Sequence, residues 1–171
     1  MCYNATEVVL NQLVEGWAMS IFYQVLAGFL GTVAFAVLFE APPKHYLYCG
    51  AIGAVGWLVY LIMFRLCHLS SVWATFLASL VLIYLSREAA YALRAPVTIF
   101  LICGIFCLVP GIGIYNFTYA FFLGDSYHAA QLGIHVLKIA IAISLGISAG
   151  YELSPKCFFA YRKHQRMRQA E

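Results

Sequence analysis

The sequence predicts an all-α polytopic membrane protein with about five transmembrane helices, the fourth of them broken or kinked. Hydrophobic residues make up 64% of the 171 positions and charged residues only 10%. This composition excludes a soluble globular domain. Apolar stretches long enough to cross a bilayer recur along the chain. One of them, residues 96–123, is interrupted just past its middle by proline and glycine.

The long stretch at residues 96–123 carries no charged residue. As one straight helix it would measure roughly 42 Å, against a hydrocarbon core of about 30 Å. Pro110 removes a backbone donor and clashes with the preceding turn, while Gly111 and Gly113 weaken the helix that follows. We therefore expect the helix to break or kink at residues 110–113, deep in the bilayer.

Hydrogen-bonding side chains follow this expected break. Backbone groups freed inside a bilayer must be satisfied by protein, ions or cavity water, and broken helices build binding sites in many transporters. We interpret the region as a substrate or ion pathway. The alternative is a proline kink absorbed by helix packing. The pathway residues predicted here are Pro110, Gly111, Gly113, Tyr115, Asn116 and Thr118.

The N-terminal segment, residues 1–16, contains two glutamates and no Lys or Arg, and Asn4 with Glu7 matches a capping box. We expect a short interfacial helix that lies on the membrane before the chain turns into the first span. A basic n-region and a small-residue cleavage site are missing, so no signal peptide is expected.

The first span is expected at residues 17–39, with Gly28 and Gly31 permitting close helix approach. It ends at Glu40, followed by a proline-rich turn. Two interpretations of Glu40 stay open. It is either a carboxylate that couples transport to an ion, or an acid solvated at the headgroup level.

Spans two and three are expected at residues 46–64 and 69–86. Glycines at positions 50, 53 and 56 of the second span predict a tightly packed backbone contact, since they weaken an isolated helix. Ser71, Thr75 and Ser79 form a polar stripe on the third. Such stripes either hold helices together or line a pore.

Two loops carry the remaining charges near the fourth span. Residues 87–94 are expected to form a short basic loop. Asp125 and His128 lie in the loop that follows the fourth span, and both can titrate. They are interpreted either as a proton-responsive pair or as part of a polar turn.

The fifth span, expected at residues 129–151, contains Lys138 near its middle. A lysine at this depth costs about 3 kcal/mol on insertion scales. Gln131, His135 and Lys138 share one helical face. If the fourth and fifth spans are antiparallel neighbours, Lys138 lies at the depth of the break. We propose one site that contains both, where Lys138 attracts a carboxylate. The alternatives are pairing with a partner subunit's acid and snorkelling.

The tail, residues 152–171, is basic and therefore expected in the cytoplasm. Five crossings then place the N-terminus outside. The net charge of +3 comes mainly from this tail, which suits anionic lipid headgroups better than nucleic acid.

Metal or cofactor chemistry is not indicated. The six cysteines include no CxxC pair, and those near the spans are interpreted as small apolar residues. Two of them share a helical face without a nearby His or carboxylate, which makes a poor metal site. Paired carboxylates and a nucleophile elbow are also missing, so an enzyme is not expected.

Five motifs in order give the chain a resemblance to a known family. They are FAVLFEAP at residues 35–42, GAIGAVGW at 50–57, ATFLASL at 74–80, residues 96–115 around the core LVPGIGIY, and IAIAISLG at 139–146. The sequence resembles the small membrane subunit of the split threonine/serine exporter family over residues 22–147. The family's proline-glycine motif corresponds to Pro110, Gly111 and Tyr115. The roles expected for Lys138, His135 and Glu40 are not implied by the resemblance and follow from the physical argument alone.

The resemblance implies a bacterial inner-membrane, multi-pass protein that works with a larger subunit of the same exporter family. It implies export of threonine and serine, or of dicarboxylates such as succinate. A scaffold subunit that contacts no substrate is the alternative. Small residues on several spans favour helix association, and homo-oligomerisation stays open.

Overall fold

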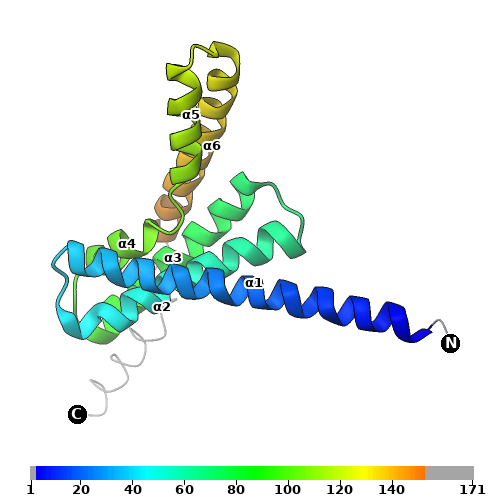
Figure 1. Ribbon diagram of the computed structural model, residues 1–171. Coiled ribbons are helices and arrows are strands. Elements are labelled where there is room, and N and C mark those ends of the chain that lie inside the picture. The colour runs from blue at the N-terminus through cyan, green and yellow to red at the C-terminus, as the bar shows by residue number, and fades with distance from the viewer. Residues whose placement is uncertain (1–2, 153–171) are drawn as a thin grey trace.

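The computed structural model describes residues 3–152, with side chains described from Ser20 onward. All regular elements in this part are helical, which confirms the predicted all-α class. Figure 1 shows α1 to α4 as a packed body, from which α5 and the N-terminal part of α6 project, while the rest of α6 packs on α3. The elements are α1 (Tyr3–Leu38), η1 (Pro43–His45), α2 (Tyr46–Leu61), η2 (Ile62–Leu66), α3 (Ser71–Leu93), α4 (Val97–Ile105), α5 (Gly111–Phe122) and α6 (Ser126–Glu152).

The first helix differs from the expectation at its N-terminus. α1 is one continuous helix of 36 residues, so the turn expected between an interfacial helix and the first span is missing. The segment before Trp17 contains no proline, and its one glycine, Gly16, lies inside the continuous helix. Its interfacial position stays a prediction.

Four helical segments of the described chain are long and apolar enough to cross a membrane. The predicted fourth span is not among them because it is divided into α4, with 9 residues, and α5, with 12 residues. These halves measure about 14 and 18 Å, so each alone is too short to span a core of about 30 Å. The predicted break is confirmed, with residues 106–110 outside both helices. The total of five crossings and the orientation stay predictions, and residues 153–171 of the tail lie outside the described part. The four segments are Ser20–Leu38, Pro43–Leu66, Ser71–Leu93 and Ser126–Glu152.

The predicted basic loop at residues 87–94 is wrong for most of its length, because α3 continues to Leu93. Only Arg94 and the two residues after it connect α3 to α4. Glu88 to Leu93 reads EAAYAL, which is mostly good helix formers. Arg87 is therefore a helical residue, and its side chain is buried.

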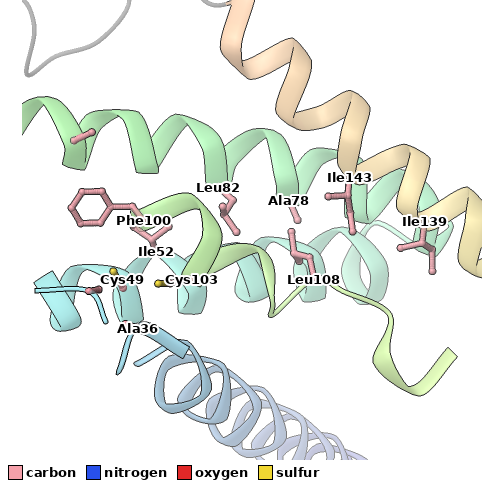
Figure 2. Packing of buried hydrophobic residues seen from close by; sticks show 12 residues of the cluster. Ala36, Cys49, Ile52, Ala78, Leu82, Phe100, Cys103, Leu108, Ile139 and Ile143 are labelled. Atoms are coloured by element: carbon pink, nitrogen blue, oxygen red, sulfur yellow. The ribbon is translucent and has the colours of Figure 1, made fainter. Parts of the chain in front are cut away.

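The apolar core lies where α4 packs against α2 and α3. Figure 2 shows Phe100 and Cys103 of α4 between Cys49 of α2 and Leu82 of α3. Ile139 and Ile143 of α6 extend the core at its other end, and Ala36 closes it from α1. The first half of the broken span is thus held firmly in the body.

Glycines create the closest helix contacts, as predicted for α2. A Cβ on Gly53 would overlap the hydroxyl of Thr32, and one on Gly50 would lie 2.7 Å from Phe29. On α6, a Cβ on Gly146 would lie 2.7 Å from the carbonyl oxygen of Phe76. α1 and α2, and likewise α3 and α6, therefore approach nearly backbone to backbone.

The contacts along α6 define the directions of its neighbours. Ser71, Ser79 and Arg87 of α3 contact His135, Gly146 and Gly150 of α6 in the same order. The two helices therefore run in parallel, and the chain between them must return through α4 and α5. One crossing of the membrane in the opposite direction, made by α4 and α5 together, would connect the two parallel helices.

Candidate functional site at the helix break and the α5–α6 hairpin

The unwound segment between α4 and α5 is anchored to α1. The ring of Phe106 stacks on that of Phe35, with 4.2 Å between centroids and 15° between planes. Next to it, the Cys107 Sγ lies 2.8 Å from the Thr32 Oγ1. Thr32 is fully buried, and its hydroxyl also donates to the Gly28 carbonyl at 2.8 Å. The break is thus a fixed feature of the packing.

Backbone hydrogen bonding changes abruptly at Pro110. The amides of Cys107 and Leu108 donate to the carbonyls three residues earlier, at 3.3 and 2.9 Å. The regular pattern resumes when Ile114 N–H donates to the Pro110 carbonyl at 2.9 Å. The first N–H groups of a helix have no partner within the helix, and they carry the positive end of its dipole. The break therefore places a helix N-terminus partway through the apolar stretch.

Of the polar residues after the break, Tyr115, Thr118 and Tyr119 lie away from α6, and Asn116 lies at the flank of the side that faces it. Gly113 and Phe117 of α5 face α6, where a Cβ on Gly113 would lie 3.0 Å from Val136 and a Cβ on Gly133 would lie 3.1 Å from Phe117. Tyr115 comes two residues after Gly113, which turns it about 200° around the helix.

Tyr115, Asn116, Thr118 and Tyr119 are all exposed. The rings of Tyr115 and Tyr119 stack with 6.2 Å between centroids. Thr118 has a partner within its own helix, because its hydroxyl donates to the Ile114 carbonyl at 2.9 Å. Tyr115, Asn116 and Tyr119 are thus the exposed polar side chains that follow the break.

Lys138 lies at the predicted depth but on the other side of α6. The Gly113–Val136 contact places the break within one helical turn of Lys138. Lys138 follows Val136 by two residues, so its side chain leaves the helix about 200° from the side that faces α5. It is exposed. This chain alone therefore does not combine Lys138 and the break into the single site that the sequence suggested.

His135 and Gln131 are also exposed on α6. The His135 Nε2 lies 3.3 Å from the Ser71 Oγ at the start of α3. Ser79, at the other end of the predicted polar stripe, lies against Gly146. Ser71 and Ser79 of the stripe therefore lie against α6, although the hydroxyls of Thr75 and Ser79 donate to carbonyls of α3 itself, those of Ser71 and Phe76.

The three predicted coupling residues, Glu40, Asp125 and His128, lie at helix ends. Glu40 is exposed and adopts a left-handed conformation, with φ 53°, where α1 ends. Two bonds close that end, from Glu40 N–H to the Val37 carbonyl and from Ala41 N–H to the Ala36 carbonyl, which is the Schellman arrangement. A glutamate stands where glycine is usual.

The Asp125 carboxylate accepts a hydrogen bond from the backbone N–H of His128 at 3.1 Å. This contact is a helix N-cap for α6 and does not involve the imidazole. It supports the interpretation of these residues as a polar turn.

Arg87 is a functional candidate that sequence reasoning missed. Its Nη1 donates to the carbonyls of Gly150 and Tyr151, at 2.8 and 2.9 Å. The last carbonyls of a helix lack partners and attract cations, so Arg87 closes the C-terminal end of α6 from α3. The wrong loop assignment hid this role.

A groove beside the break also escaped prediction. It has a volume of about 300 Å³ and lies between α1, α2 and the start of the unwound segment. Its lining is mainly small or aromatic, which suits an apolar group better than a charged one. The lining residues are Gln24, Ala27, Gly28, Gly31, Phe35, Trp57, Phe106 and Cys107.

No group of three or more His, Cys, Asp or Glu side chains suited to a metal ion occurs between residues 3 and 152 where side chains are described. The arrangement instead offers a helix break, exposed tyrosines and an amide. Together with the apolar helices, it defines a multi-pass membrane protein of the transporter class.

The sequence profile described as "Threonine/Serine exporter, ThrE" matches residues 24–151. The chain belongs to this family, which confirms the resemblance seen in the sequence motifs. The family is one of transporters and not of enzymes.

One relative is an uncharacterized protein of Haemophilus influenzae, 27% identical over 98 residues. The match covers 57% of this chain and 33% of the relative, so the chain matches about a third of that protein's length. No solved structure matches this chain.

Proposed function

We propose that this chain is one subunit of a secondary transporter that exports threonine, serine or a dicarboxylate such as succinate across the bacterial inner membrane. A second, larger membrane subunit of the same family completes it. Family membership supports the transport class. The relative from Haemophilus influenzae supports the existence of a second subunit, because about two thirds of that protein lie outside the segment that this chain matches.

The observation that carries this proposal is the broken fourth span. Its first half is fixed in the core through Phe100 and Cys103, while α5 packs against α6 and stands free of the body. A break between a fixed half and a free half is the kind of element from which transporters build a binding site near the midplane.

The chemistry of the break suits a small molecule that carries a carboxylate. The N-terminus of α5 provides the positive end of a helix dipole and the N–H groups of Ile112 and Gly113, whereas the N–H of Gly111 donates to the Val109 carbonyl at 2.8 Å. The Asn116 amide and the Tyr115 hydroxyl add donors and acceptors on the exposed side of α5. Threonine, serine and succinate all carry a carboxylate. Because these side chains are exposed, the second subunit must cover them to complete the pathway.

The test uses proteoliposomes that contain both subunits and are loaded with labelled threonine, serine or succinate. We expect efflux of at least one of them. Asn116→Leu should lower the efflux rate about tenfold or more, because removing the amide leaves a polar group of the substrate without its partner. Thr98→Leu is the matched control, since Thr98 is an exposed polar residue on α4.

Co-purification of the two subunits is measured in parallel. Efflux of none of the three substrates by a folded, inserted pair would overturn the proposed substrate class. Efflux that is unchanged in Asn116→Leu, and equally present with the larger subunit alone, would support the scaffold alternative.

A further inference from the structure

The outer side of α6 carries a regular row of exposed residues. They follow one another at spacings of 4, 3, 4, 3 and 4, which is the pattern of a helix-packing seam. We call this row the outer seam; it consists of Tyr127, Gln131, Ile134, Lys138, Ile141 and Leu145. Its four large apolar members are 50 to 77% exposed.

The outer seam lies on a side of α6 that faces neither α5 nor α3. α6 uses Gly133 and Val136 toward α5, and Gly146 and Gly150 toward α3. The seam lies opposite α5 and roughly a quarter turn from α3. From Tyr127 to Leu145 it measures about 27 Å, which is close to the thickness of the hydrocarbon core. A single transmembrane helix would fit along its whole length.

Lipid alone does not suit this seam because Lys138 lies at its centre. Lys138 is about 18 Å from the start of α6 and about 21 Å from its end. Both ends are farther than a lysine side chain comfortably reaches toward the headgroups. Within the described residues no carboxylate pairs with it. A charge at this depth requires a partner of opposite sign.

A second copy of this chain does not supply that partner. Two-fold pairing along the seam would place Lys138 opposite Lys138. None of the seven carboxylates of the sequence lies at the middle of an apolar segment. Glu88 lies in the last two turns of α3, and the others lie at helix ends or connections, before Ser20, or in the C-terminal tail of the sequence. The seven are Glu7, Glu15, Glu40, Glu88, Asp125, Glu152 and Glu171.

We propose that the outer seam of α6 binds a transmembrane helix of the second exporter subunit, and that this helix carries an aspartate or glutamate opposite Lys138. The inference rests on the proposed function for the existence of that subunit. A polar residue at one position of an apolar seam fixes the register and the identity of the partner helix. Lys138 is thus the residue that selects the partner, on the side of α6 opposite the break.

The test places a photo-crosslinking amino acid at Ile134 or Ile141 of the full chain, co-expressed with the larger subunit. The control position is Leu47, which is 69% exposed on α2. We expect crosslinks from the seam positions to one transmembrane segment of the larger subunit that contains Asp or Glu, and none from Leu47. Crosslinks mainly to a second copy, no protein crosslink, or equal crosslinking from Leu47 would overturn the proposal.

Charge reversal then tests the ion pair in the same complex. Lys138→Glu should lower co-purification of the larger subunit by about tenfold or more, because like charges at a buried contact oppose binding. Changing the crosslinked acid of that subunit to Lys should restore it, and Lys138→Arg should retain it. Unchanged co-purification of Lys138→Glu would contradict the pairing.

The two proposals fail separately. If the two subunits transport a substrate but crosslink only through another face, the proposed function stands and the proposed seam contact is wrong. If they crosslink at the seam but move none of the three substrates, the seam contact stands and the proposed function is wrong.

Discussion

Gly113 of α5 packs directly against Val136 of α6, so closely that a Cβ at position 113 would lie 3.0 Å from the valine methyl group. This contact fixes the register of the hairpin. It brings the helix break to the level of Lys138 along α6, while the Lys138 side chain leaves α6 on the side opposite α5. The hairpin therefore presents two separate polar surfaces, one on α5 and one on α6.

Gly113→Leu should destabilise the protein by about 1–3 kcal/mol, because the added side chain has no room against Val136. Val136→Ala should recover part of the loss. Gly111→Ala is the control, since a Cβ there meets nothing within 4 Å. Thermal unfolding in detergent, followed by fluorescence-detected size exclusion, measures the change. Equal effects of Gly113→Leu and Gly111→Ala would show that the register is wrong.

Gly53→Ala should lower the unfolding temperature strongly, because its Cβ would overlap the hydroxyl of buried Thr32. Combining it with Thr32→Ala should be less harmful than the sum of the two single changes, since they share one contact. Gly31→Ala provides the comparison, because position 31 is open. Additive effects of Gly53→Ala and Thr32→Ala would refute the close contact between α1 and α2.

Arg87→Leu should cost about 1–3 kcal/mol, because the carbonyls of Gly150 and Tyr151 lose a donor. Arg87→Lys should be intermediate, since lysine keeps the charge but not the planar guanidinium. Hydrogen exchange at the C-terminal turn of α6 measures the local effect. Protection there that is identical in wild type and Arg87→Leu would contradict the capping role.

Glu40→Gly should raise stability by about 1 kcal/mol, because glycine adopts the left-handed conformation at φ 53° without strain. Glu40→Ala keeps the strain and should not gain this stability. Export by the two-subunit complex should persist in Glu40→Gly if the residue only ends a helix. Loss of export with a raised unfolding temperature would instead identify Glu40 as a coupling carboxylate.

The sequence was informative about the fold wherever backbone chemistry decides it. Pro110 and its neighbouring glycines predicted the break, and Gly53 predicted a close helix contact. The loop expected at residues 87–94 was wrong because the charge of Arg87 suggested the end of the span. Residues 88–93, EAAYAL, favour a helix, and Arg87 is accommodated inside α3 by carbonyl partners on α6. A contact 63 residues away along the chain is not visible in local pattern.

The candidate site was less predictable, because the depth of a residue along a helix and the side of the helix on which it lies are set by different features of the sequence. Hydropathy and loop length placed Lys138 at the level of the break. The side was decided by Gly113 and Gly133, the small residues that admit Val136 and Phe117 into the α5–α6 interface. The small size of Gly133 was the signal available in the sequence. It marks the side of α6 that packs against α5, and Lys138 lies on the opposite side.

The most direct test of the account compares efflux from proteoliposomes that contain this chain alone with efflux from those that contain it with the larger subunit. Labelled threonine, serine and succinate are the substrates, and insertion of both chains is verified by protease protection. We predict efflux only from the pair, because Tyr115, Asn116 and Lys138 are left exposed by this chain. Efflux of equal rate from this chain alone would contradict this prediction.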